Sequence, residues 1–193
     1  MRKNLLISLL MTVVTTVLLG IIYPLLVTGV AQVLFPKKAN GQLIEANGKV
    51  IGSRIIGQAF TAPEYFHSRP SSAGNGYDPL NTNGSQLGPT NQKLIDRVKG
   101  DVATAQAENP GTPVPVDLVT TSASGLDPEI TLAGAAFQLP RVAKARGVSE
   151  EQLRQLVALH TDERQFGVLG EPRVNVLELN LELDQKFTQA KRQ

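Results

Sequence analysis

The densest group of chemically capable side chains lies between Tyr65 and Ser71, in the sequence Tyr-Phe-His-Ser-Arg-Pro-Ser. In this segment His67 could act as a general base, Ser68 or Ser71 as a nucleophile, and Arg69 as a clamp for an anion. No acidic residue stands at a recognisable spacing to orient the histidine. We therefore favour a packed loop anchored by its aromatic residues, or a surface that contacts a partner protein, over a catalytic site.

The rest of the sequence lacks the residues that most catalytic and metal sites need. His67 and His160 are the only histidines, and the chain has no cysteine. This composition excludes a histidine-rich metal site, disulfides, thiolate metal sites and a cysteine nucleophile. The phosphate-binding loop, the nucleophile elbow and the zinc-protease motif are also missing. We predict no catalytic residue and no metal site.

Asp127, together with two nearby serines, could imitate part of a hydrolase site. However, Asp127-Pro128 has the form of a helix N-cap followed by proline at the first helical position. We therefore predict a helix from Pro128, kinked or split at Pro140 because proline removes one backbone hydrogen bond, and ended by Gly147. On this interpretation capping accounts for Asp127 without any catalytic role.

The elements that must position these side chains begin with a hairpin and a long loop. Residues 42–52 are predicted to form a β-hairpin, since Asn47-Gly48 supplies two positive φ angles between β-prone runs. Residues 59–91 are crowded with Pro, Gly, Asn and Ser and are predicted to be a loop. Loops of this length are uncommon unless they are functional or disordered. Its apolar residues indicate an ordered loop with its own anchors: Tyr65, Phe66, Tyr77 and Leu87.

Further elements follow the loop. A helix is predicted between Asn91 or Thr90, either of which can cap it, and Asn109-Pro110-Gly111, which ends it. Residues 114–120 are β-prone, but Pro115 restricts them to an edge strand or an extended segment. A capping box at residues 149–152 opens another helix. Residues 174–184 alternate like a strand and also present a helical face, and we favour a helix.

The chain begins with a long uncharged apolar run. No charged residue lies between Asn4 and Pro36, and the run is flanked by Arg2-Lys3 and Lys37-Lys38. About 20 residues of helix suffice to cross a bilayer. We predict an uncleaved transmembrane helix over residues 5–35, in preference to a cleaved signal, whose apolar core is only about 7–15 residues long.

The basic pair before the run favours a cytoplasmic amino terminus at residues 1–4 and an external soluble domain at residues 36–193. Four of the 19 basic residues lie at the flanks of the run, so the remainder carries a slight excess of acidic residues. That balance argues against binding to nucleic acid. Within the run, either the helix packs against another membrane helix or it is a tilted, slightly kinked lone span in lipid. The candidate packing positions are Thr12, Thr15, Gly20, Pro24 and Gly29.

Several segments of the sequence resemble the C subunit of the bacterial potassium-transporting Kdp ATPase. The resemblance runs in one order from the anchor almost to the carboxyl terminus. The segments that carry it are Tyr65–Ser71, Gly84–Asn91, Pro115–Pro128, Pro140–Arg146 and Gly170–Asn180.

The resemblance implies a function that the residues alone do not give. The complex contains a channel-like subunit that binds potassium, a P-type ATPase subunit phosphorylated on aspartate, and a very small membrane subunit. It lies in the bacterial inner membrane, and ATP hydrolysis drives potassium uptake. The C subunit is not catalytic, is needed for assembly, and is described as a catalytic chaperone that raises the ATP affinity of the ATPase subunit. ATP and potassium therefore act at the level of the complex.

The orientation of the anchor limits how such a chaperone could work. If Arg2-Lys3 keeps the amino terminus inside, the soluble domain lies in the periplasm, across the bilayer from ATP. We therefore expect an α+β chain with a single amino-terminal transmembrane helix and one mixed extracytoplasmic domain that acts through contacts. The competing hypothesis is a membrane-anchored envelope hydrolase or binding protein that uses the 65–71 loop. The candidate contact residues are Tyr65, Phe66, His67, Arg69, Pro70, Leu87 and Asn91.

Overall fold

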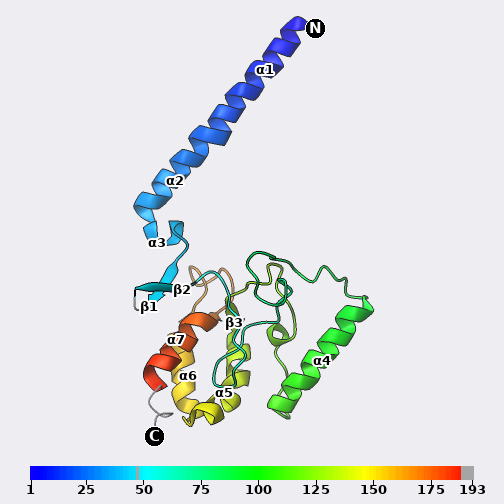
Figure 1. Cartoon of the computed structure of the whole chain (residues 1–193), viewed down its shortest axis with the longest axis vertical. Coiled ribbons are helices and arrows are strands. Elements are labelled where there is room, and N and C mark those ends of the chain that lie inside the picture. Colours follow the sequence, from blue (N-terminus) through cyan, green and yellow to red (C-terminus); the bar gives the residue numbers. More distant parts are fainter. Residues whose placement is uncertain (47, 188–193) are drawn as a thin grey trace. The chain divides into compact units, whose positions relative to one another are not determined.

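The computed structural model describes residues 1–46 and 48–187. The chain forms two compact units, which divide in the sequence between Ile51 and Gly52. The first unit contains the amino-terminal helix and a hairpin, and the second contains the remaining helices and a small sheet (Figure 1). This mixture of helix and sheet confirms the predicted α+β class.

The first unit opens with one helix that is long and apolar enough to cross a membrane, from Arg2 to Leu34. It consists of α1 (Arg2–Val17), a π-helical turn η1 (Leu18–Ile22) and α2 (Tyr23–Leu34). In the π-helical turn the Tyr23 amide donates to the Leu18 carbonyl, five residues back. Because Pro24 has no amide hydrogen, this wider turn carries the helix past the proline without a break.

A short helix and a hairpin complete the first unit. They are α3 (Pro36–Ala39) and the paired strands β1 (Leu43–Ala46) and β2 (Lys49–Ser53), the last two residues of which belong to the second unit. The predicted hairpin is thus confirmed in its strands. Gly48 has a φ of +72°, as the tight turn requires. Asn47, the other predicted turn residue, lies outside the described residues.

The second unit is built on a three-stranded antiparallel sheet in the order β3-β5-β4. The strands are β3 (Glu129–Thr131), β4 (Thr161–Asp162) and β5 (Arg173–Asn175). Three helices pack with this sheet: α5 (Leu132–Arg146), α6 (Glu150–Leu159) and α7 (Val176–Phe187) (Figure 1). Together they enclose the core, which includes Ile130, Leu139, Val142, Leu153, Leu156, Val174, Leu179 and Leu183.

The predicted helix from Pro128 is wrong at its start. Residues 129–131 pair with β5, so α5 begins only at Leu132, and Thr131 caps it by accepting from the Gly134 amide at 2.9 Å. Asp127 is therefore not a helix cap. Gly147, with a φ of +68°, ends the helix as predicted.

Of the kink or split predicted at Pro140, the split does not occur. α5 runs through the proline, and buried residues on both sides of it hold the helix in the core. Residues 114–120 form no strand; they contain a 3-10 turn, η2 (Val116–Leu118), in which the Asp117 carboxylate accepts from the Thr131 amide at 2.7 Å. This hydrogen bond, between residues 14 positions apart, ties the 3-10 turn to the start of α5.

The other predicted helices hold in whole or in part. α4 (Gln92–Glu108) is capped by Asn91 and ends at Asn109. The capping box at residues 149–152 is present at the start of α6. The segment predicted as a helix over residues 174–184 is divided: its first residues belong to β5, and α7 begins at Val176.

Candidate functional site

The loop of residues 59–91 is described along its whole length and contains no helix or strand. It is nevertheless fixed to the core at one residue in particular. Phe66 is completely buried and belongs to the same apolar cluster as Leu139 and Leu179. The predicted ordered loop with an aromatic anchor is thus confirmed, and the anchor penetrates between α5 and α7.

Two buried side-chain amides hold the backbone of this anchor and of the residue that follows it. Asn180 of α7 accepts from the Phe66 amide and donates to the Phe66 carbonyl, both at 2.9 Å. Gln138 of α5 accepts from the His67 amide at 2.7 Å and donates to the His67 carbonyl at 3.0 Å. A side-chain amide has the donor and acceptor of a peptide group, so these two residues replace the neighbouring strand that the loop lacks. We call Asn180 and Gln138 the amide clamp.

Arg141 of α5 binds backbone carbonyls of the loop just before Phe66. Its Nη1 donates to the Pro63 carbonyl at 2.7 Å and to the Tyr65 carbonyl at 2.9 Å. Its Nη2 donates to Gln138 Oε1 at 2.6 Å, which fixes the clamp itself. The guanidinium of Arg141 thus satisfies backbone groups that have no strand or helix to bond to.

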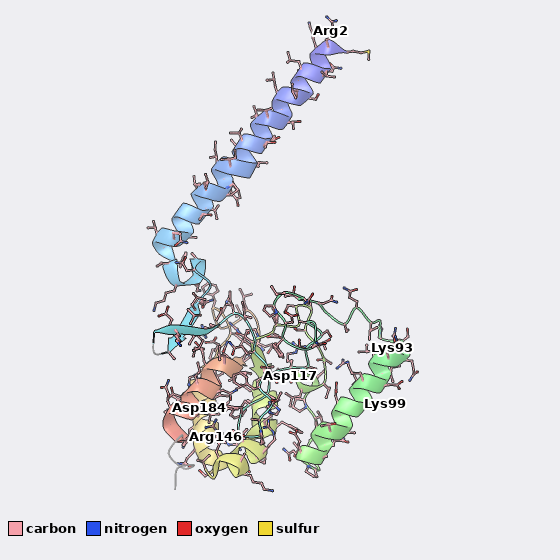
Figure 2. All side chains as sticks on the ribbon, viewed as in Figure 1. Arg2, Lys93, Lys99, Asp117, Arg146 and Asp184 are labelled. Carbon is pink, nitrogen blue, oxygen red and sulfur yellow. The ribbon has the colours of Figure 1, made fainter. Side chains whose placement is uncertain are left out.

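Arg146 completes the attachment from the end of α5. Its Nε donates to the Glu64 carbonyl at 2.7 Å, and its Nη2 pairs with Asp184 at 2.8 Å (Figure 2). The guanidinium also lies 4.9 Å from the centre of the Tyr65 ring, whose hydroxyl donates to Asp184 at 2.9 Å. Tyr65 is therefore held at its backbone, its ring and its hydroxyl.

His67 is not arranged as a general base. Its Nε2 lies 3.0 Å from the Ala62 carbonyl, which can only accept, so Nε2 carries the proton of this hydrogen bond. Burial and the positive charge of Arg141 lower the pKa of His67. The neighbouring Ser68 hydroxyl donates to the Gln58 carbonyl at 3.4 Å instead of to the imidazole. Within the described residues, no serine, histidine and carboxylate form a catalytic relay.

Arg69 is engaged inside the domain and is not a free anion clamp. Its Nη1 pairs with Asp127 at 2.9 Å, and its Nε and Nη2 donate to the Thr120 carbonyl and hydroxyl at 3.4 and 3.3 Å. Asp127 also accepts from the Glu129 amide at 3.0 Å. The carboxylate therefore joins Arg69 to the start of β3, which is its role in place of the predicted helix cap.

Ser71 and Tyr77 close the same region. The Ser71 hydroxyl donates to the Gly125 carbonyl at 2.6 Å and accepts from the Tyr77 amide at 2.8 Å. The Tyr77 hydroxyl donates to the Arg69 carbonyl at 2.7 Å, and burial raises the pKa of Tyr77 to about 12. Gly125 has a φ of +70°, and a Cβ there would lie 2.7 Å from the Ala73 amide. Only glycine therefore fits where the chain at residue 125 passes the loop at Ala73.

The other candidate contact residues are less buried than Phe66. Pro70 and Leu87 are half-buried, and Asn91 is exposed and caps α4 through the Lys93 amide at 2.9 Å. Sequence reasoning missed the clamp and the two arginines. The signal that could have found them is the presence of Gln138 and Asn180 among core-facing apolar residues of α5 and α7.

A cleft of about 420 Å³ lies between the first part of the loop and helices α4 and α5. Its polar lining includes His67, Arg69, Asp101 and Glu108. In the part of the chain that the structure describes, no group of three metal-binding side chains occurs. The described side chains are therefore arranged to fix the shape of a surface. They do not form the serine, histidine and carboxylate relay of a hydrolase.

The sequence was compared with models of known families and with curated proteins. The family model described as K+-transporting ATPase, c chain, matches residues 5–185. The chain belongs to the KdpC family. A KdpC subunit of Koribacter versatilis is 71% identical over 184 residues, which cover 95% of each chain. KdpC subunits of Rhodopseudomonas palustris BisB18 and Acidobacterium capsulatum are 59% and 57% identical, covering 88% and 92% of this chain and 91% and 96% of theirs.

As a KdpC subunit, the chain is an accessory subunit of the potassium-transporting ATPase and is not its catalytic subunit. The segments that suggested the KdpC family are joined in the fold. The 65–71 segment meets the 115–128 segment through Arg69 and Asp127, and it meets the 170–180 segment through Asn180. The residues of these segments therefore hold the loop of residues 59–91 against the core of the second unit.

Proposed function

We propose that this KdpC subunit acts only through contacts with the other subunits of the ATPase and has no nucleotide site of its own. The proposal rests on one observation: the polar side chains of the 65–71 segment are engaged in hydrogen bonds and an ion pair inside the domain. Its histidine, arginine and serines are bound to carbonyls and to Asp127 of the same domain. This leaves a rigid, shaped surface and no reactive group, which favours the accessory role over the envelope hydrolase.

The proposed partners are the potassium-binding channel-like subunit, the P-type ATPase subunit and the very small membrane subunit. The domain of residues 36–193 lies in the periplasm and covers the outer face of the potassium-selecting subunit. Residues such as Tyr65, Phe66 and His67 contribute by fixing the shape of that surface. The higher ATP affinity of the ATPase subunit then follows from stabilising one arrangement of the complex, since a ligand-linked equilibrium can be shifted from a distant surface.

The membrane helix is proposed to lie in the bacterial inner membrane, with residues 1–4 in the cytoplasm. No side chain of Arg2–Leu34 is covered in the described chain apart from a half-covered Ala31, so lipid or another subunit must cover the helix. The hydroxyls of Thr12 and Thr15 each donate to carbonyls of their own helix at 2.8 Å. Together with Gly20, Pro24 and Gly29 they are proposed as positions where another helix packs closely rather than forms hydrogen bonds.

The placement can be tested with single cysteines, because the chain has none of its own. Thr82→Cys lies in the exposed part of the loop, and Asn4→Cys lies before the apolar run. In cells with a permeabilised outer membrane, a membrane-impermeant maleimide should label Thr82→Cys, while Asn4→Cys should react only after lysis. The reverse pattern would place the domain with ATP and would favour direct nucleotide binding.

A further inference from the structure

The connection between β4 and β5 exposes three apolar side chains on one short turn of the second unit. Within it, Gln165 and Leu169 exchange backbone hydrogen bonds of 2.8 and 2.9 Å and close a tight turn. The side chains of Phe166, Val168 and Leu169 are 92%, 72% and 56% exposed. We call these three residues the apolar tip. Three uncovered apolar residues on one short turn form a contact surface that the domain itself does not use.

The backbone of the turn is formed at a cost to stability. Phe166 has a φ of +55°, a left-handed conformation that is strained for a large side chain and that glycine adopts freely. The side chain gains no burial in return. Neither the core nor the local geometry therefore explains why an aromatic residue stands at this position.

The strand that leads to the apolar tip is bonded to the first residues of the second unit. Asp162, at the end of β4, accepts from Arg54 Nη2 at 2.6 Å, and Arg54 also pairs with Glu178 of α7 at 2.9 Å. Arg54 is close in sequence to Gly52, the first residue of the second unit. The connection that carries the tip is thus fixed at its base to the segment that leads from the membrane helix.

The charges at the base of the tip favour a protein over a lipid surface. Arg164 pairs with Glu171 at 2.7 Å, and Arg173 pairs with Glu129 at 2.8 Å, so the basic residues nearby are neutralised. Glu163 adds an exposed negative charge. Membrane surfaces bind proteins through unpaired Lys and Arg next to apolar residues, which is the opposite pattern.

We propose that the apolar tip is a docking element, in which Phe166 enters an apolar pocket on the potassium-selecting subunit, whose outer face the domain is proposed to cover, and basic side chains at the pocket rim face Glu163. This inference rests on the proposed contact role and names Phe166 as a residue that makes the contact. A single exposed aromatic residue that fills a pocket is a common source of binding energy in protein interfaces.

The test is Phe166→Gly in the full chain, co-expressed with the other subunits and purified in detergent. Glycine suits the positive φ and removes no buried surface, so the melting temperature of the purified chain should be unchanged or higher. Recovery of the other subunits should fall at least tenfold. The matched control is Leu80→Gly, which removes another side chain that is 91% exposed and should leave recovery within twofold of the unaltered chain.

Full recovery with Phe166→Gly, or an equal loss with Leu80→Gly, would overturn the docking element while leaving the contact role intact. Failure of the unaltered chain to recover any subunit would instead overturn the contact role, and the docking element with it. A photoreactive phenylalanine analogue at position 166 identifies the occupant of the surface. A covalent adduct with the potassium-selecting subunit supports the proposal, and adducts with another subunit or with lipid alone contradict it.

Discussion

Replacing Phe66 by alanine is expected to lower the free energy of unfolding by about 3–5 kcal/mol, the usual range for a buried phenylalanine. Phe66 is fully buried in the core cluster and is the only residue of its segment with a fully buried side chain. Its removal leaves a cavity between α5 and α7 that the clamped backbone prevents from collapsing. Because domains are stable by only about 5–15 kcal/mol, this change removes much of the total.

The measurement is urea unfolding of the full chain in mild detergent, followed by tyrosine fluorescence. Phe166→Ala is the matched control, since its ring is 92% exposed and its removal should change the free energy of unfolding by less than about 0.5 kcal/mol. A loss below about 1 kcal/mol for Phe66→Ala would mean that the loop is not fixed to the core through this residue.

Asn180→Leu is expected to cost a similar amount, about 3–5 kcal/mol, although it adds apolar surface to the core. Leucine has nearly the shape of asparagine but cannot bond to the Phe66 amide and carbonyl, which stay buried. Each unsatisfied buried group costs about 1–3 kcal/mol. Asn180 is 1% exposed, so water cannot replace the lost bonds without opening the domain.

Hydrogen exchange gives a second measure for this variant, because the Phe66 amide should lose most of its protection while amides in the centre of α6 keep theirs. The control is Asn75→Leu on the exposed part of the loop, which should change stability by less than about 0.5 kcal/mol. Retained protection at Phe66 would show that another group replaces Asn180. The amide clamp would then not be what holds the loop.

These two effects bear on how the 65–71 segment is interpreted. A substitution there that abolishes assembly of the ATPase is expected to do so by unfolding the surface, since the segment is joined to α5, α7 and the 115–128 region. Loss of transport in such a variant therefore does not show that a reactive group was removed.

The sequence was most informative where one local rule determines the structure. The long apolar helix that could span a membrane follows from the absence of charge between Asn4 and Pro36, and the starts of α4 and α6 follow from Asn91 and from the capping box at residues 149–152. The anchored character of the loop was also predictable, because Tyr65 and Phe66 are apolar residues in a segment otherwise rich in Pro, Gly and Ser.

The errors occurred where tertiary contacts override local preference. Asp127-Pro128 has the form of a helix start, yet pairing of Glu129–Thr131 with β5 delays the helix. The amide clamp joins residues 114 positions apart in the case of Asn180 and Phe66, and no local pattern reports such a distance. The loop and its aromatic anchor could thus be predicted from the sequence, but the side chains of α5 and α7 that hold the loop could not.

The central claim is that this KdpC subunit works through a rigid surface and supplies no chemistry. The most direct test is the double variant His67→Gln/Ser68→Ala, measured as potassium-dependent ATP hydrolysis per assembled complex. The glutamine amide can still donate to the Ala62 carbonyl, so the loop should stay folded, and we predict activity within about twofold of the unaltered complex. A loss of about 100-fold or more, the scale of a missing general base, in a fully assembled complex would contradict the account.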